Sequence, residues 1–106
     1  MNEVELVNLA RSHYSEEQVA LLEKAIHYAT DKHDGQLRKS GEPYITHPLQ
    51  VAAMLIDWGM DIDSVIAGVL HDTVEDTDAT LEEITELFGR DIAFLVDGVT
   101  KVSQAR

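Results

Sequence analysis

With 106 residues and no cysteine, the chain is long enough for one domain with a modest hydrophobic core, and disulfide scaffolds and cysteine-ligated zinc sites are excluded. Its formal net charge of -12 argues against general affinity for nucleic acids or anionic membranes, because both partners require clustered positive charge. The amino terminus lacks the basic and apolar regions of a signal peptide and no stretch is long enough to cross a bilayer, so we expect a soluble cytoplasmic protein.

Short helices are predicted in the amino-terminal third of the chain. Residues 3–11 have a weak apolar pattern that permits a helix. Ser15 is the expected N-cap of the next helix, with Gln18 as its capping-box partner, and apolar residues at three- and four-residue spacing continue it to about Asp34–Gly35. Residues 35–43 contain two glycines, a proline and no apolar period, which predicts a loop or a tight hairpin.

A strongly apolar helix is predicted after this loop. Thr46 or His47 is its expected cap, and Pro48 suits its first helical position, where a missing N–H costs nothing. Apolar residues cover nearly every side of the helix, so we expect it to be buried, with Trp58 as a packing aromatic.

The following helix begins after Asp61 or Asp63, and its apolar run ends at His71-Asp72. If these two consecutive apolar helices pack as an antiparallel pair, His47 at the start of one comes close to His71 at the end of the other.

Two more helices complete the prediction. The first begins at Thr80, buries Leu87 among other apolar residues and ends at Gly89. The last begins at about Arg90 and turns residues such as Val99 inward. Because no segment alternates like a strand, the predicted fold is all-α, an antiparallel helical bundle with short connections.

The dipeptide His71-Asp72 is unusual at the end of so apolar a run, because an unpaired charge in a low-dielectric setting is costly. A bound cation would remove that cost. With His47 as a third ligand, two imidazoles and a carboxylate suit Zn, Mn or Fe and leave positions open for water or substrate. The pattern therefore predicts a divalent-metal phosphohydrolase site, although a hydrogen-bonded core histidine is the ordinary role of His71 taken alone.

Basic residues gather near the predicted loop, where Lys32, Arg38 and Lys39 fall within eight positions. A local basic patch beside a metal suits a small phosphorylated ligand better than a polymer. Taken alone, Arg38-Lys39 is an ordinary loop charge pair, and Glu75-Asp76 is a solvated acidic turn.

Four motifs carry a resemblance to a known family. Residues 33–48 (HDGQLRKSGEPYITHP), 71–77 (HDTVEDT), 88–89 (FG) and 96–101 (VDGVTK) resemble the hydrolase domain of the Rel/Spo (RelA/SpoT homologue) ppGpp synthetase/hydrolases. The fold that this resemblance implies is of HD-domain type.

The resemblance also implies roles for individual residues around the metal. His47, His71 and Asp72 would hold a manganese ion. Glu75 and Asp76 would be the acidic pair that positions or deprotonates the attacking water.

In the same family, Arg38, Lys39 and Ser40 would line the nucleotide site, with the Arg38 guanidinium against guanine. The implied reaction removes the 3′-pyrophosphate from guanosine tetra- or pentaphosphate, giving GDP or GTP and pyrophosphate. The parent protein of such a domain belongs to the stringent response and can also be a GTP pyrophosphokinase.

One expected feature has no match in the chain. The family's fourth metal ligand is an aspartate in a later helix, and the matching stretch would lie beyond Arg106, whereas Asp91 and Asp97 are better explained as a helix-start residue and a motif residue. We therefore expect residues 1–106 to be the N-terminal part of a single, incomplete domain. Weak metal affinity, little turnover and self-association through exposed apolar surface are the expected consequences.

Two alternatives remain open from the sequence. A different HD-type nucleotide phosphohydrolase would share the metal ligands but should lack the loop of residues 38–44. A non-catalytic regulatory module would keep the fold and bind a nucleotide or a partner without hydrolysis.

Overall fold

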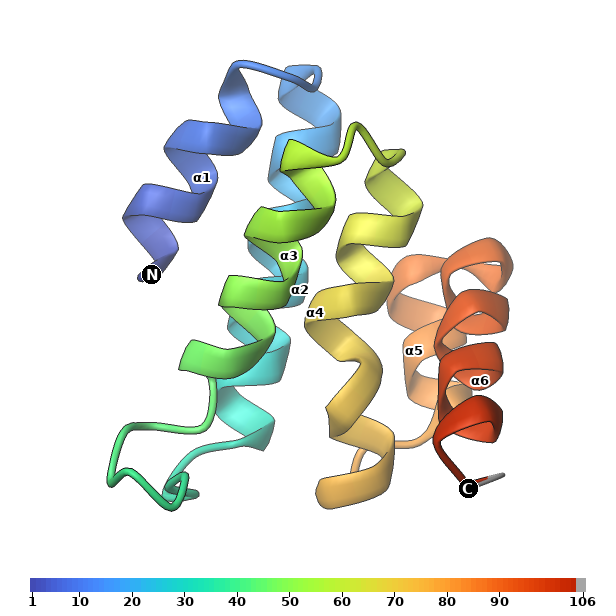
Figure 1. Cartoon of the computed structure of the whole chain (residues 1–106). Coiled ribbons are helices and arrows are strands. Elements are labelled where there is room, and N and C mark those ends of the chain that lie inside the picture. The colour runs from blue at the N-terminus through green and yellow to red at the C-terminus, as the bar shows by residue number, and fades with distance from the viewer. Residues whose placement is uncertain (105–106) are drawn as a thin grey trace.

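The computed structural model describes residues 1–104, and side chains within residues 1–101. This part of the chain folds into six helices without a strand, in agreement with the predicted all-α class (Figure 1). The helices are α1 (Glu3–Arg11), α2 (Glu16–Lys32), α3 (Thr46–Asp57), α4 (Ile62–Asp76), α5 (Leu81–Phe88) and α6 (Arg90–Gln104). None of the helices in residues 1–104 is long and apolar enough to cross a membrane.

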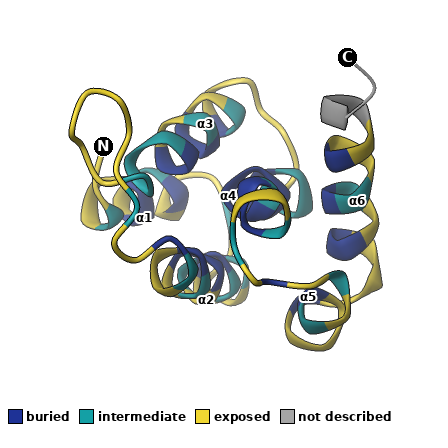
Figure 2. Cartoon of the chain, turned by 90° about the horizontal axis from the view of Figure 1, so that it is seen from below, coloured by how far each residue is buried: buried dark blue, intermediate teal, exposed yellow. Residues whose placement is uncertain are grey.

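Helix α4 is the centre of the bundle. It packs against α2, α3 and α6, while α1 packs on α2 and α3 and α5 packs on α6 (Figure 2). Its sequence explains this position, because every residue from Val65 to Leu70 is buried, whereas a surface helix buries only one stripe. The helix that carries the His71-Asp72 pair is thus held by neighbours on several sides.

Side-chain caps fix the starts of several helices. Ser15 and Gln18 form the predicted capping box at the start of α2, with reciprocal hydrogen bonds of 2.9 and 3.2 Å. Asp61, one of the two candidates named above, caps α4 by accepting from the backbone N–H of Ser64. Thr80 caps α5 in the same way. These local signals were readable because each depends on residues three positions apart.

The loop between α2 and α3 is a tight hairpin. Leu37 and Pro43 form an isolated antiparallel bridge, and the Arg38 N–H donates to the Glu42 carbonyl at 2.8 Å. Gly41 turns the chain with a φ of 88°, a left-handed conformation that glycine adopts without steric cost. This confirms the predicted loop or hairpin over residues 35–43.

The predicted cap of α3 was wrong. Ile45 is the residue that precedes the helix, and no side chain caps it. Thr46 is already the first helical residue, so His47 is the second and Pro48 the third. His47 therefore does not use its imidazole to cap the helix.

The burial predicted for nearly every side of α3 was also wrong, since Met54 is 50% exposed, and so was the burial predicted for Trp58, Leu87 and Val99. Trp58 at the end of α3 is 68% exposed, because α3 packs only against α1 and α4 among the principal helix contacts and leaves its other side in solvent. Leu87 on α5 and Val99 on α6 are likewise exposed rather than turned inward. A helix at the rim of a bundle has too few neighbouring helices to bury all of its apolar side chains.

Candidate metal centre

The antiparallel arrangement of α3 and α4 places His47 near the carboxyl-terminal part of α4 (Figure 1). Helix α4 does not end at His71-Asp72, as the apolar run suggested, but continues to Asp76. Glu75 follows His71 by four residues, and Asp76 follows Asp72 by four, so each pair lies on one face of the helix. All five side chains therefore belong to two helices that pack together.

His47, His71 and Asp72 each offer one ligand atom, and these atoms lie within 4.8 Å of one another. The His71 Nε2 atom is 3.0 Å from Asp72 Oδ1, and the His47 Nε2 atom is 4.0 Å from Asp72 Oδ2. Asp72 is buried and the two histidines are half-buried. Among the residues that the structure describes, no other group of three has this geometry.

Hydrogen bonds determine which nitrogen of His71 is available. Its Nδ1–H donates to the Gly68 carbonyl at 2.6 Å, so in the neutral ring Nε2 is the unprotonated atom that faces Asp72. Burial alone would lower the pKa of His71, but its hydrogen bonds to Asp72 and to the Gly68 carbonyl outweigh burial and raise that pKa. Burial would raise the pKa of Asp72, but its contacts with the protonated His71 ring and the hydrogen bond from the Tyr44 hydroxyl outweigh burial and lower that pKa.

Tyr44, which the sequence analysis missed, contacts the cluster from the loop. Its hydroxyl donates to Asp72 Oδ2 at 3.0 Å and lies 3.2 Å from Asp76 Oδ2. Burial, followed by the bond to Asp72, raises the pKa of Tyr44, so the hydroxyl stays protonated near neutral pH. The available signal was an aromatic hydroxyl three residues before His47 in a polar loop, but that signal is weak without the fold.

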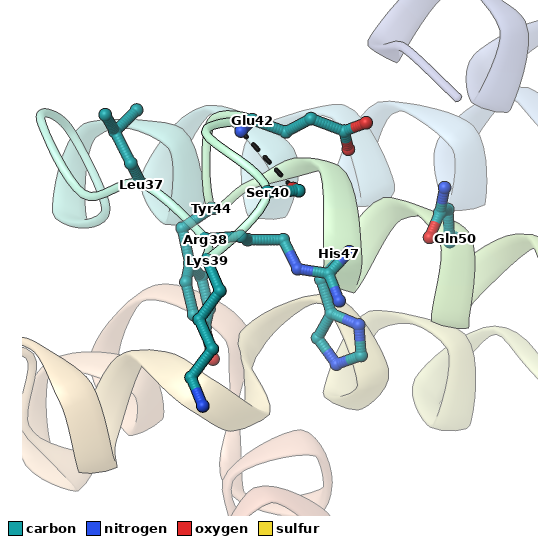
Figure 3. Close-up of a pocket in the computed structure, with 8 residues that line it drawn as sticks. All are labelled: Leu37, Arg38, Lys39, Ser40, Glu42, Tyr44, His47 and Gln50. Atoms are coloured by element: carbon teal, nitrogen blue, oxygen red, sulfur yellow. Dashed lines mark hydrogen bonds between the residues drawn. The ribbon is translucent and has the colours of Figure 1, made fainter.

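Arg38, Lys39 and Ser40 lie on the exposed hairpin and line a cleft of about 780 Å³ that also reaches His47 (Figure 3). In Figure 3 the side chain of Arg38 extends in the direction of the His47 ring. The remaining wall residues are Leu37, Glu42, Tyr44 and Gln50. The structure thus brings the basic loop residues together with one of the three candidate ligands.

Glu75 and Asp76 are exposed on the last turn of α4 and are not part of the cleft wall. Asp76 is joined to Asp72 through the Tyr44 hydroxyl. The negative charge of Glu75 contributes to the raised pKa of His71. Both carboxylates therefore lie beside the cluster rather than within it.

The three side chains fit a divalent transition metal. Two imidazole nitrogens and one carboxylate oxygen are ligands that Mn, Fe and Zn accept. Two atoms bound to one such ion lie up to about 4.4 Å apart, so the cluster requires only small side-chain rotations to share a cation. Three protein ligands also leave coordination positions for water or substrate.

Comparison with known proteins agrees with this geometry. The sequence profile described as HD domain matches residues 25–106. The chain belongs to the HD-domain family. The chain has two His-Asp pairs, His33-Asp34 and His71-Asp72, and the second pair lies in the cluster.

The relatives of this HD domain confirm the resemblance to the Rel/Spo proteins. It is 57% identical over 84 residues to a GTP pyrophosphokinase of Myxococcus xanthus, and this alignment covers 79% of this chain and 11% of the relative. It is 50% identical over 95 residues to the guanosine-3′,5′-bis(diphosphate) 3′-pyrophosphohydrolase of Aquifex aeolicus, covering 90% of this chain and 14% of the relative. With the bifunctional (p)ppGpp synthase/hydrolase SpoT of Escherichia coli it is 43% identical over 101 residues, or 95% of this chain and 14% of the relative.

A solved structure gives the same result for the fold. The HD domain matches a metazoan orthologue of SpoT that hydrolyses ppGpp, with a TM-score of 0.73 and 36% sequence identity. The match covers 82% of this chain and 49% of the other. This chain thus spans about half of the structural neighbour and no more than 14% of the three relatives named above.

Proposed function

We propose that this HD domain removes the 3′-pyrophosphate from guanosine tetra- or pentaphosphate, with a manganese ion held by His47, His71 and Asp72. The single observation that carries the proposal is the convergence of these three side chains beside a cleft lined by Arg38 and Lys39. The Aquifex aeolicus relative is named for hydrolysis of this nucleotide, and the Escherichia coli relative is named for both its synthesis and its hydrolysis. Both names support the choice of substrate.

The metal ligands are prepared for their role by their surroundings. The Gly68 carbonyl holds the Nδ1–H of His71 and leaves Nε2 free, as is usual for a metal-binding imidazole. Donation from the Tyr44 hydroxyl favours the ionised form of Asp72, so its carboxylate offers a negative charge. When bound, a divalent cation supplies Lewis acidity and lowers the pKa of a coordinated water.

Glu75 and Asp76 are proposed to accept the proton of the attacking water and to orient it. Both carboxylates lie one helical turn beyond a proposed ligand, and both are exposed, so water and substrate can reach them. A positioned carboxylate of this kind is a suitable general base.

The basic hairpin is proposed to bind the nucleotide. Arg38 has a planar guanidinium that can stack on guanine, and Lys39 offers a compact positive charge for phosphate. Ser40 adds a hydroxyl at the same edge of the cleft. Arg38 and Lys39 supply local positive charge on a chain whose net charge is -12, which favours a small anion over a polyanion.

The proposal is tested by incubating the chain with ppGpp and Mn²⁺ and measuring pyrophosphate release, with Mn²⁺ raised to millimolar levels to offset weak affinity. His71→Ala should abolish release, because it removes one of three proposed ligands. His27→Ala is the matched control, since His27 is an exposed histidine on α2 that pairs only with Glu3 among the described contacts. Equal release by wild type and His71→Ala would contradict the proposal.

The two alternatives give different results in the same assay. Cleavage of deoxynucleoside monophosphates or cyclic nucleotides in place of ppGpp would identify another HD-type phosphohydrolase. Binding of ppGpp without release would identify a non-catalytic module. A cytoplasmic site of action belongs to the proposal, because a chain without cysteine is compatible with a reducing compartment.

A further inference from the structure

We propose that Tyr44 is a positioning residue: its hydroxyl holds the carboxylates of Asp72 and Asp76 side by side and ties the hairpin of residues 35–43 to the last turn of α4. The functional part of this inference rests on the metal site proposed above. The geometric part concerns the hairpin alone and stands without a metal.

The side chain of Tyr44 is held at both ends. Its ring stacks on the buried ring of His33, with the centroids 4.6 Å apart and the planes 28° apart. Its hydroxyl lies between two carboxylates, 3.0 Å from Asp72 Oδ2 and 3.2 Å from Asp76 Oδ2. A tyrosine fixed in this way cannot turn without losing either its stacking or both hydrogen bonds.

Gln36 provides a second connection from the other end of the hairpin. Its Nε2 donates to the backbone carbonyl of Asp76 at 2.9 Å, and its Oε1 lies 3.0 Å from Nδ1 of His33. The Tyr44 N–H in turn donates to the Gln36 carbonyl at 3.0 Å. Both ends of the hairpin are therefore fastened to the residue that ends α4, and Arg38 lies between them.

The hydroxyl has a specific task at this place. Asp72 and Asp76 lie four residues apart on one helix face, and two negative charges at this spacing repel each other. A donor shared between them offsets that repulsion and sets the direction of Asp72. Phenylalanine would keep the stacking on His33 but would supply no donor, so Tyr44→Phe isolates the hydroxyl.

The first measurement is the rate of amide hydrogen exchange in the hairpin, followed by NMR in the absence of metal. Four hairpin amides are bonded within the loop and report its opening: those of Gln36, Arg38, Gly41 and residue 44. Since a hydrogen bond to a charged acceptor is lost, Tyr44→Phe should raise their exchange about tenfold relative to core amides of α2 and α4.

Tyr28→Phe is the matched control for this measurement. The Tyr28 hydroxyl also donates to a carboxylate, that of Glu83 at 2.6 Å, but it joins α2 to α5 away from the cleft. Its loss should leave hairpin exchange unchanged. The core amides show in each variant that the bundle is folded.

Titration with Mn²⁺ provides the second measurement and separates positioning from simple support of the loop. Tyr44→Phe should weaken Mn²⁺ binding by about 10- to 100-fold, the usual effect of losing a hydrogen bond to a metal ligand. Gln36→Ala loosens the hairpin but touches neither carboxylate side chain, so it should weaken Mn²⁺ binding much less than Tyr44→Phe does.

The inference is overturned if Tyr44→Phe leaves hairpin exchange at the wild-type rate, if it binds Mn²⁺ as tightly as the wild type does, or if Gln36→Ala weakens Mn²⁺ binding as much as Tyr44→Phe does. If the wild type binds no Mn²⁺ at all, the proposed function fails, while the metal-free exchange comparison still decides whether Tyr44 fastens the hairpin.

Discussion

Replacing Gly68 by alanine tests how firmly α3 and α4 hold His47 against His71. A Cβ atom at Gly68 would lie 2.8 Å from Leu55 Cδ1 and 3.6 Å from Val51 Cγ1, both on α3. The first distance is too short, so Leu55 must move. It can do so, because Leu55 is half-buried and lines a cavity of about 260 Å³ between α3, α4 and α6.

Two terms of similar size decide the effect on stability. Alanine is favoured over glycine in a helix interior by about 0.8–1.0 kcal/mol. Turning Leu55 away from its rotamer costs about 0.5–1.5 kcal/mol. We therefore expect Gly68→Ala to change the free energy of unfolding by less than about 1 kcal/mol. In a Leu55→Ala background, where the contact is absent, the same substitution should stabilise by about 1 kcal/mol.

Urea unfolding of wild type, Gly68→Ala, Leu55→Ala and the double variant measures the effect of Gly68→Ala in both backgrounds. Mn²⁺ affinity should be the same for wild type and Gly68→Ala, because the residue 68 carbonyl that accepts from His71 remains. A loss of more than about 2 kcal/mol, as in overpacked cores, would show that Leu55 cannot move aside. A Gly68→Ala effect that is equal in the two backgrounds would show that the contact with Leu55 does not decide it.

Two further predictions concern the fold. Asp61→Ala should lower the free energy of unfolding by about 0.5–2 kcal/mol by removing the N-cap of α4. Hydrogen bonding from Ser64 lowers the pKa of Asp61, so its contribution is complete above the ordinary carboxyl pKa and lost as the pH falls through the lowered value. Asp61→Asn keeps a cap without a charge, so its stability relative to wild type should rise in acid, and urea unfolding across pH 2–6, roughly the carboxyl range, checks both variants. Trp58→Ser should change stability by no more than about 0.5 kcal/mol, because Trp58 is 68% exposed; a loss several times larger, measured in the same way, would show that the indole is packed.

The parts of the fold that could be predicted are those fixed by neighbouring residues. The Ser15 capping box, the Asp61 cap and the hairpin around Gly41 each depend on a few consecutive positions. The approach of His47 to His71 was also predictable, because a short connection between two apolar helices favours antiparallel packing. These inferences needed no knowledge of distant contacts.

The parts that could not be predicted depend on how many neighbours an element meets. The exposure of Trp58 follows from the place of α3 at the rim of the bundle, which its apolar composition does not indicate. The continuation of α4 to Asp76 was hidden because its last turn is polar. The contact of Tyr44 with Asp72 joins residues 28 positions apart and arises only when the hairpin folds back onto α4.

We propose above that one cation binds between His47, His71 and Asp72. The most direct test is an anomalous difference map from crystals of this chain soaked in Mn²⁺. We expect a peak bounded by the two imidazole Nε2 atoms and the Asp72 carboxylate, each about 2.0–2.3 Å away. A map with manganese only at surface carboxylates, and none between these three side chains, would contradict it.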